Sequence, residues 1–202
     1  WLTVRHFQQA LPSVAAIRAI ELGEPMRVFT ADGLLMAEYG TERRSSVRFD
    51  EIPRRVIEAF IAAEDERFMR HHGVDPVGLW RASVRLLQTG ERTQGGSTIT
   101  MQLARNVFLS SERTYTRKIR EILLAIQIED ELSKEEILEL YLNKIFLGER
   151  AYGVAAAAQT YFSRPLSALT LDQAALIAGL PKAPSRDNPI ASPSRSMERR
   201  NY

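Results

Sequence analysis

From Pro53 onward, apolar residues recur at intervals of three and four, the spacing that gathers side chains on one face of an α-helix. Helix boundary signals divide this region. Asp75-Pro76 opens one helix and Gly90 ends it, and the stretch SKEE at 133–136 is typical of a capping box. We therefore predict a mainly α fold, with helices that include residues 53–68 and 151–162.

Strand-like alternation occurs only near the start of the chain. The stretch MRVFTADGLLMAEYG, residues 26–40, has two short apolar runs on either side of Asp32-Gly33. This residue pair favours the tight turn of a β-hairpin. We expect a short hairpin there.

Composition excludes several classes of protein. The net charge of +2 gives no support for a nucleic-acid partner, and the absence of cysteine excludes disulfide frameworks and thiolate metal sites. No apolar run approaches the roughly 18–20 residues that span a bilayer. The start has no signal-peptide pattern, and the end begins like a new helix at Ser192-Pro193. We expect the chain to be a piece of a longer protein.

Glu64 interrupts an apolar stripe. Steps of four from Val56 reach Phe60, Glu64 and then Phe68, so a carboxylate lies on the face that otherwise packs. A partly desolvated carboxylate has a raised pKa and suits a general base. The alternative is a glutamate at the stripe's edge with a solvated head, and spacing alone favours that alternative. Asp65, rotated by about 100°, is expected to reach solvent.

Two adjacent histidines, His71 and His72, could suggest a metal site. Neighbouring residues at a helix end do not face one ion, and no further ligand stands at a suitable spacing. Capping or packing before Gly73 is the favoured interpretation.

The stretch GGSTITMQLARN, residues 95–106, joins a glycine-rich loop to a helix N-terminus, where free N–H groups attract anions. Thr98, Gln102 and Arg105 share one polar face of the predicted helix. The alternative, an ordinary capped amphipathic helix, leaves the glycine pair unexplained.

The stretch RKIRE, residues 117–121, places several cations beside Glu121. Arg117 and Glu121 are four residues apart, the usual spacing of a solvated helix pair. The density of positive charge here nevertheless suits a phosphate or a diphosphate.

The segment GLWRASVRLLQTGER, residues 78–92, combines apolar and basic side chains. The apolar members are Trp80, Leu86 and Leu87. A basic amphipathic helix with tryptophan can lie on an anionic membrane surface, but the sequence alone favours a buried core helix with a solvated basic face at least as much.

Four stretches follow one another in order: ED..F..H.G at 64–73, GGSTIT.QLA.N at 95–106, RK..E at 117–121 and K.EILELYLN at 134–143. In this order they resemble the successive motifs of the bacterial peptidoglycan glycosyltransferase domain. The resemblance covers about residues 26–200, and LNKIFLGERAYGVAAAA is most similar to the bifunctional class A penicillin-binding proteins. Met101 and Arg105 depart from the glutamine and lysine that many members have.

The resemblance implies a fold and a reaction. The fold would be a lysozyme-like, two-lobed helical domain with a head and a small membrane-facing jaw. The reaction would polymerise lipid II with inversion at the donor sugar and release of undecaprenyl diphosphate. Glu64 would be the general base and Glu121 the second acid, possible ligand of a divalent cation (Mg or Mn). The implied substrate-binding residues are Ser97, Thr98, Gln102, Arg105, Asn106, Arg117 and Lys118.

The resemblance also implies partners and a location. The partners would be lipid II, the nascent lipid-linked strand, the membrane surface through Trp80, Leu86 and Leu87, and moenomycin-type inhibitors. The location would be the outer, periplasmic face of the bacterial inner membrane. Residues 1–25 would follow a missing anchor, 26–190 would form the glycosyltransferase domain, and 191–202 would lead to a missing transpeptidase.

Two other functions remain open at this point. A lysozyme-like hydrolase also uses a glutamate at a helix end, but it has no lipid diphosphate for the basic residues to hold. A membrane-surface or scaffolding module could keep the fold without activity. The presence of both Glu64 and Glu121 argues against that module without excluding it.

Overall fold

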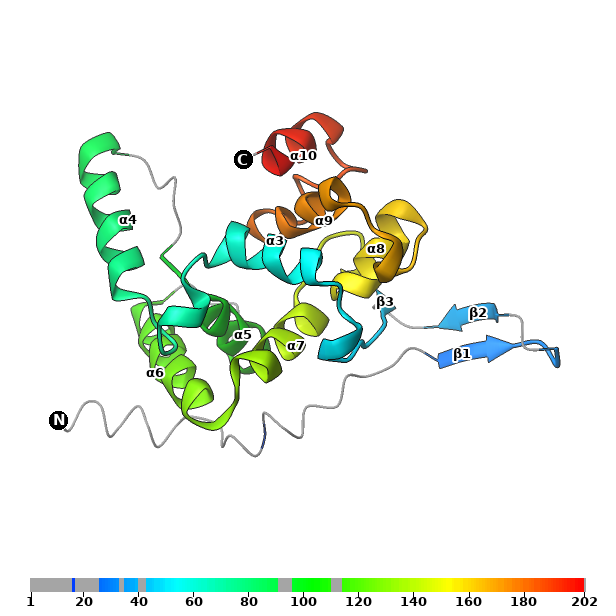
Figure 1. The fold of residues 1–202 in the computed structure, drawn as a ribbon, viewed down its shortest axis with the longest axis horizontal. Coiled ribbons are helices and arrows are strands. Elements are labelled where there is room, and N and C mark those ends of the chain that lie inside the picture. The colour runs from blue at the N-terminus through cyan, green and yellow to red at the C-terminus, as the bar shows by residue number, and fades with distance from the viewer. Residues whose placement is uncertain are drawn as a thin grey trace. The chain divides into compact units, whose positions relative to one another are not determined.

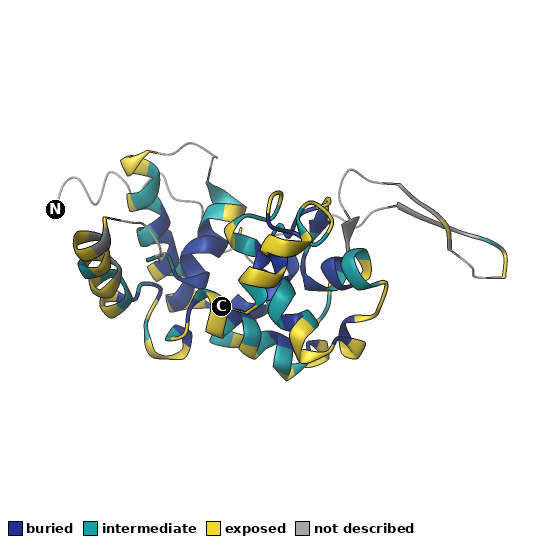
Figure 2. Ribbon diagram, turned by 90° about the horizontal axis from the view of Figure 1, so that it is seen from above, coloured by how far each residue is buried: buried dark blue, intermediate teal, exposed yellow. Residues whose placement is uncertain are grey.

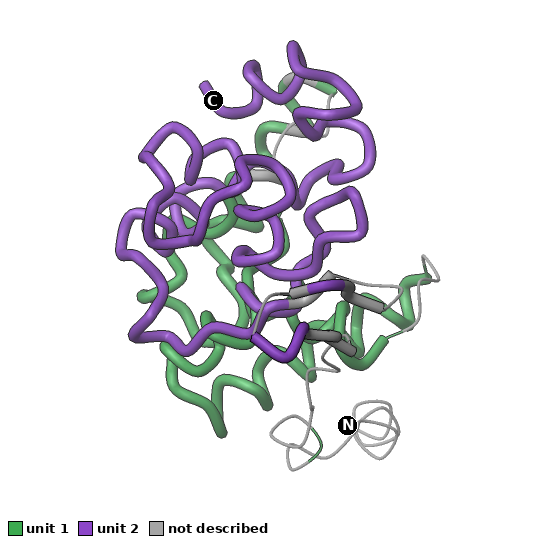
Figure 3. Tube along the Cα trace, turned by 90° about the vertical axis from the view of Figure 1, so that its right-hand side faces the viewer, with its two compact units in different colours: residues 1–20, 64–141 green, residues 21–63, 142–202 purple. Residues whose placement is uncertain are grey.

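The computed structural model describes residues 16, 26–32, 35–39, 43–90, 96–109 and 114–201. The chain divides into two compact units (Figure 3). Unit 1 contains residues 64–141, and unit 2 combines residues 21–63 with 142–202. The N-terminal segment proposed for residues 1–25 lies outside the described residues, apart from Ala16.

Helices make up most of the described chain, as predicted (Figure 1). The α-helices are α3 (Arg54–Glu64), α4 (Pro76–Thr89), α5 (Ile99–Phe108), α6 (Tyr115–Glu131), α7 (Lys134–Lys144), α8 (Val154–Phe162), α9 (Leu171–Ala178) and α10 (Pro193–Arg200). Short 3-10 helices are η1 (Phe49–Glu51), η2 (Phe68–Arg70), η3 (Leu166–Ala168) and η4 (Leu180–Lys182).

The described strands form two small pairs in unit 2. Strand β1 (Met26–Phe29) pairs antiparallel with β2 (Leu35–Tyr39), in the segment where the sequence favours a hairpin. Strand β3 (Arg43–Arg44) pairs parallel with β4 (Ala151–Tyr152). The prediction of a helix from residue 151 was therefore wrong at its start. Gly153, with φ +84°, separates β4 from α8, because this backbone angle does not fit a right-handed helix.

The core of unit 1 lies between α5, α6 and α7. Helix α5 packs against α6, and the side chains that face this core are fully buried (dark blue in Figure 2). They are Ile99, Met101, Ala104, Leu124, Ala125, Ile128, Ile137, Leu138 and Tyr141. On α6, Leu124, Ala125 and Ile128 recur at intervals of one, three and four, so they share the face that packs.

Gly73 brings the loop after α3 against α6. Its φ is +77°, and an added Cβ would lie 2.7 Å from the backbone oxygen of Ala125. The Thr98 hydroxyl donates to the Gly73 carbonyl at 2.6 Å. Only glycine fits this backbone angle and this close approach.

Unit 2 is held together by contacts between its helices and by side-chain hydrogen bonds. Helix α9 packs against α10, and α8 contacts β4 and η3. Asn143 accepts the Val47 N–H at 2.9 Å and donates to the Val47 carbonyl at 2.8 Å, so one amide replaces a strand partner. Across the described ranges, no helix combines the length and the apolar character that a membrane crossing requires.

Candidate active site

Glu64 is the last residue of α3 and is half-buried. Val56, Phe60 and Phe68 are fully buried, so the carboxylate does interrupt a packed stripe. The predicted helix to residue 68 was too long: α3 ends at Glu64, and Phe68 starts η2. The carboxylate Oε2 of Glu64 accepts a 2.7 Å hydrogen bond from Nε2 of Gln102.

Asp65 explains why the chain turns directly after Glu64. Its carboxylate accepts the Ile99 N–H at 3.0 Å, at the first residue of α5, and lies 2.9 Å from Nε2 of His71. Asp65 is buried, so the expectation that it reaches solvent was wrong. The N–H groups of a helix N-terminus favour a carboxylate, and this contact binds the end of α3 to the start of α5.

The two histidines have different partners. His71 is buried against Asp65, and its ring meets Phe68 edge-on at 6.0 Å between centroids. His72 is exposed and lies 2.8 Å from Asp130. This agrees with packing rather than a shared metal.

Glu121 is a buried carboxylate that lies between two partly exposed cations. Its Oε2 is 2.7 Å from Nη1 of Arg117, and its Oε1 is 2.7 Å from Nζ of Lys118. The carboxylate is only 1% exposed, so the alternative of a solvated helix pair was wrong. Lys118 also donates to the Ser97 hydroxyl at 2.9 Å, just before α5.

Arg117 retains hydrogen-bonding capacity. Its Nε is buried and has no hydrogen-bond partner in the described part of the chain. A buried guanidinium N–H without an acceptor is costly, and a phosphate oxygen is the acceptor that guanidinium groups bind best.

Helix α5 carries three of the predicted substrate-binding residues, Gln102, Arg105 and Asn106. Thr98 is its N-cap and accepts the Met101 N–H at 3.1 Å. Gln102 is buried, Arg105 is half-buried and Asn106 is exposed. The loop residues 91–95 lie outside the described residues, so the anion-binding role of Gly95 stays a prediction.

Sequence reasoning missed two residues of α7 that support this site. The Tyr141 hydroxyl lies 3.3 Å from Oε1 of Gln102. Lys134 donates to the His71 carbonyl at 2.8 Å and lies 4.2 Å from the Phe68 ring centroid. Both belong to the K.EILELYLN stretch, and a polar group on the packed face of a helix was the available signal.

These positions can be compared with known proteins. The sequence profile of the family described as Transglycosylase matches residues 32–202. The chain belongs to the transglycosylase family. This confirms the resemblance noted in the sequence and the expected enzyme class, a peptidoglycan glycosyltransferase.

Curated relatives of this transglycosylase domain are longer proteins. It is 57% identical over 197 residues to penicillin-binding protein 1A of Escherichia coli, covering 98% of this chain and 23% of that protein. It is 59% identical over 181 residues to penicillin-binding protein 1A of Haemophilus influenzae, covering 90% of this chain and 21% of that protein. A crystal structure of the Haemophilus influenzae protein aligns with a TM-score of 0.46 and 38% identity, over 90% of this chain and 18% of the other.

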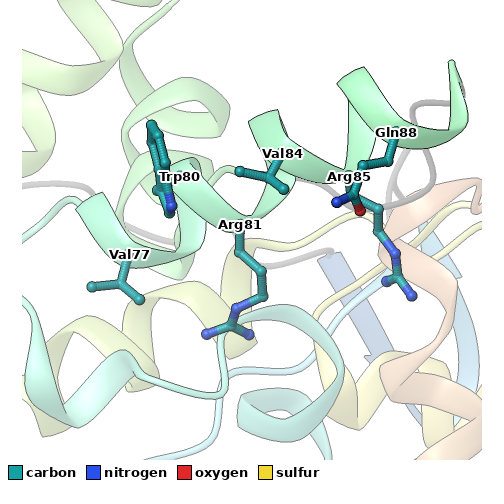
Figure 4. Close-up of a pocket in the computed structure, with 6 residues that line it drawn as sticks. All are labelled: Val77, Trp80, Arg81, Val84, Arg85 and Gln88. Atoms are coloured by element: carbon teal, nitrogen blue, oxygen red, sulfur yellow. The ribbon is translucent and has the colours of Figure 1, made fainter.

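Outside the buried site, α4 of the transglycosylase domain presents apolar side chains at its surface. Trp80 is 72% exposed and Leu87 is 87% exposed, so the core-helix alternative was wrong for these two residues. The side chain of Leu86 lies outside the described part. A hollow of about 630 Å³ runs along the helix, and Figure 4 shows its lining residues, all from α4: Val77, Trp80, Arg81, Val84, Arg85 and Gln88.

Proposed function

We propose that this domain polymerises lipid II into glycan strands, with inversion at the donor sugar and release of undecaprenyl diphosphate. One observation carries the proposal: Gln102 of α5 and Ser97, which precedes the N-cap of α5, contact Glu64 and the cations around Glu121 respectively. Gln102 donates to Glu64, and Ser97 accepts from Lys118. A base for the acceptor and cations for a diphosphate are thus attached to one segment, residues 97–102.

Glu64 has the environment of a general base. Its half-buried carboxylate accepts a proton from the acceptor's sugar hydroxyl as that oxygen attacks the donor sugar. The side-chain N–H of Gln102 donates a hydrogen bond to Glu64 and stabilises its ionised form, which is the form that can accept the proton. The new glycosidic bond forms as the bond to the diphosphate breaks.

The basic cluster receives the leaving group. Charge develops on the diphosphate as its bond to the sugar breaks, and fixed cations stabilise that charge most effectively in a poorly solvated site. Arg117 and Lys118 are held in place by Glu121, and Arg105 adds a half-buried guanidinium from α5. Thr98 and Asn106 complete the proposed substrate-binding set.

A divalent cation remains a proposal separate from this sequence of steps. Both oxygens of Glu121 are already 2.7 Å from cationic nitrogens. No cluster of three or more potential metal ligands exists among the residues that the structure describes. These residues alone do not fit a cation at Glu121, so no step here passes through a metal.

Several further features belong to the same proposal. The domain adopts a lysozyme-like arrangement with a membrane-facing jaw formed by α4, and residues 26–190 form the glycosyltransferase domain. It works at the periplasmic face of the inner membrane, where α4 contacts lipid through Trp80 and Leu87. Their exposure and the neighbouring Arg81 and Arg85 support this contact. Moenomycin-type inhibitors bind the same substrate-binding residues.

The test is direct. The purified domain is incubated with lipid-linked disaccharide-peptide precursor in detergent, and the products are separated by size. Glycan polymer together with free polyprenyl diphosphate supports the proposal. Unchanged precursor contradicts it, and release of free disaccharide-peptide without polymer indicates a hydrolase instead.

A further inference from the structure

Tyr141 is a fully buried tyrosine in the apolar core of unit 1. Its neighbours on α7, Ile137 and Leu138, are also fully buried. A phenylalanine would fill the same volume without the cost of burying a hydroxyl, so the hydroxyl needs a reason to be there.

The hydroxyl is one end of a short chain of hydrogen bonds. It lies 3.3 Å from Oε1 of Gln102, and Nε2 of Gln102 lies 2.7 Å from Oε2 of Glu64. Two elements thus hold the two ends of one amide: α7 holds its oxygen, and the end of α3 receives its NH₂ group.

The orientation of this amide matters to the carboxylate. A side-chain amide has an acceptor oxygen and a donor NH₂ group, and rotation by about 180° exchanges them. With the NH₂ group toward Glu64, the amide stabilises the ionised carboxylate. With the oxygen toward Glu64, it repels the ionised form and accepts a hydrogen bond from the protonated form.

Tyr141 is a dependable donor in this position. Burial raises the pKa of its phenol well above the ordinary value, and the negative charge of Glu64 acts in the same direction. Arg105 lowers that pKa and Asp65 raises it. The phenol therefore keeps its proton at the pH of any ordinary assay.

We infer that Tyr141 is a positioning residue: its hydroxyl holds the Gln102 amide with the NH₂ group toward Glu64, so that the base returns to its ionised form. The inference rests on the proposed role of Glu64. Tyr141 acts through Gln102 and needs no contact with substrate.

The first test is a double-mutant cycle on polymerisation, with Tyr141→Phe, Gln102→Ala and the double variant. Loss of one orienting hydrogen bond should lower turnover about 3–10-fold in Tyr141→Phe. The same change should have no further effect once Gln102 is alanine. Additive losses in the double variant would overturn the inference, because they would show that Tyr141 acts by another route.

The pH profile of Tyr141→Phe is the second test. A carbonyl oxygen toward Glu64 favours its protonated form, so the acid limb of the turnover profile should move to higher pH. The other charged groups in this region, Asp65 with its partner His71, and Arg105, are unchanged in the variant. An acid limb that stays in place would contradict the inference.

Tyr161→Phe is the matched control. The Tyr161 hydroxyl donates to the Leu147 carbonyl at 2.7 Å in unit 2, so this change also removes one tyrosine hydrogen bond. Turnover and the acid limb should both stay as in the parent domain. An equal shift in this variant would mean that the effect of Tyr141→Phe is not specific.

A third readout does not depend on activity. In protein labelled with ¹⁵N-glutamine, the Gln102 NH₂ signals are identified by their loss in Gln102→Ala. They should move in Tyr141→Phe and stay unchanged in Tyr161→Phe. Unmoved signals in Tyr141→Phe would overturn the inference even if the proposed function holds. Normal polymerisation by Glu64→Gln would instead contradict the proposed function, and a shift of the Gln102 signals in Tyr141→Phe would still stand.

Discussion

Lys134 and Glu129 form a largely buried ion pair at 2.6 Å. Lys134 also donates to the His71 carbonyl, so the pair is joined to the loop that follows Glu64. The Glu129 carboxylate is 2% exposed and also accepts from the Thr100 hydroxyl. Lys134→Met would leave this carboxylate without a counter-charge. We expect the free energy of unfolding to fall by about 3–5 kcal/mol in chemical denaturation.

The double variant Lys134→Met/Glu129→Gln provides the control for that prediction. Removing the charge of Glu129 as well should restore a large part of the lost stability, because no buried charge is then left alone. If the single and double variants unfold at the same denaturant concentration, the pair does not carry the stability assigned to it.

Gly73→Ala tests the close approach of the loop to α6. An alanine Cβ would meet three backbone atoms of Ala125 and Ile126 at 2.7–2.9 Å, in addition to the strain of a φ of +77°. Gly90→Ala is the matched control, because its φ is +69° and no described residue lies within 4 Å of the added Cβ. The control should lose about 1–3 kcal/mol, and Gly73→Ala should lose clearly more. Equal midpoints in urea for the two variants would show that the contact is not restrictive.

Glu121→Gln tests the buried cluster against an ordinary helix pair. Arg117 and Lys118 would lose the charge that holds them, so we expect polymerisation to fall strongly while the melting temperature changes modestly. Glu58→Gln is the control: Glu58 pairs with Arg54 at the same i,i+4 spacing and at 2.7 Å, on an exposed helix surface. An equally small fall in turnover in both variants would show that Glu121 only pairs with Arg117 along the helix and has no role in polymerisation.

The contrast between these two pairs shows what the sequence could predict. Spacing along a helix identified the Arg117–Glu121 pair, and Arg54 and Glu58 have the same spacing, but spacing could not tell which pair would be buried. The apolar stripe of α3 and the caps of α5 and α7 were predictable, because they depend on neighbours in the chain. The burial of Asp65 was not, since its partner Ile99 is 34 residues away.

The supports of Glu64 were missed for the same reason. Tyr141 and Lys134 act on residues of other elements, and a polar group on a packed helix face does not by itself identify its distant partner. The start of α8 was misplaced because β4 takes its partner from β3, more than a hundred residues earlier. Long-range pairing of this kind overrides local helix propensity.

The exposed side of α4 leads to a prediction on membrane binding. Replacing Trp80 and Leu87 with serine should weaken binding to vesicles of anionic lipid, and added salt should weaken the parent's binding because Arg81 and Arg85 attract headgroups. The fold should survive, since both side chains are largely exposed. Leu171→Ser/Ile190→Ser alters two comparably exposed residues of unit 2 and should leave binding unchanged. Equal vesicle binding by the α4 variant and the parent would remove α4 from the membrane contact.

The role of Glu64 as general base is the central claim, and polymerisation of lipid-linked precursor by Glu64→Gln tests it most directly. Glu66→Gln is the control, because Glu66 lies two residues away with a side chain that is 78% exposed. General-base catalysis contributes roughly 10²–10⁴-fold, so Glu64→Gln should lose at least about 10²-fold in turnover while Glu66→Gln stays near the parent. Circular dichroism should show the same helical fold in all three proteins. Near-normal glycan polymer from a folded Glu64→Gln variant would contradict the account.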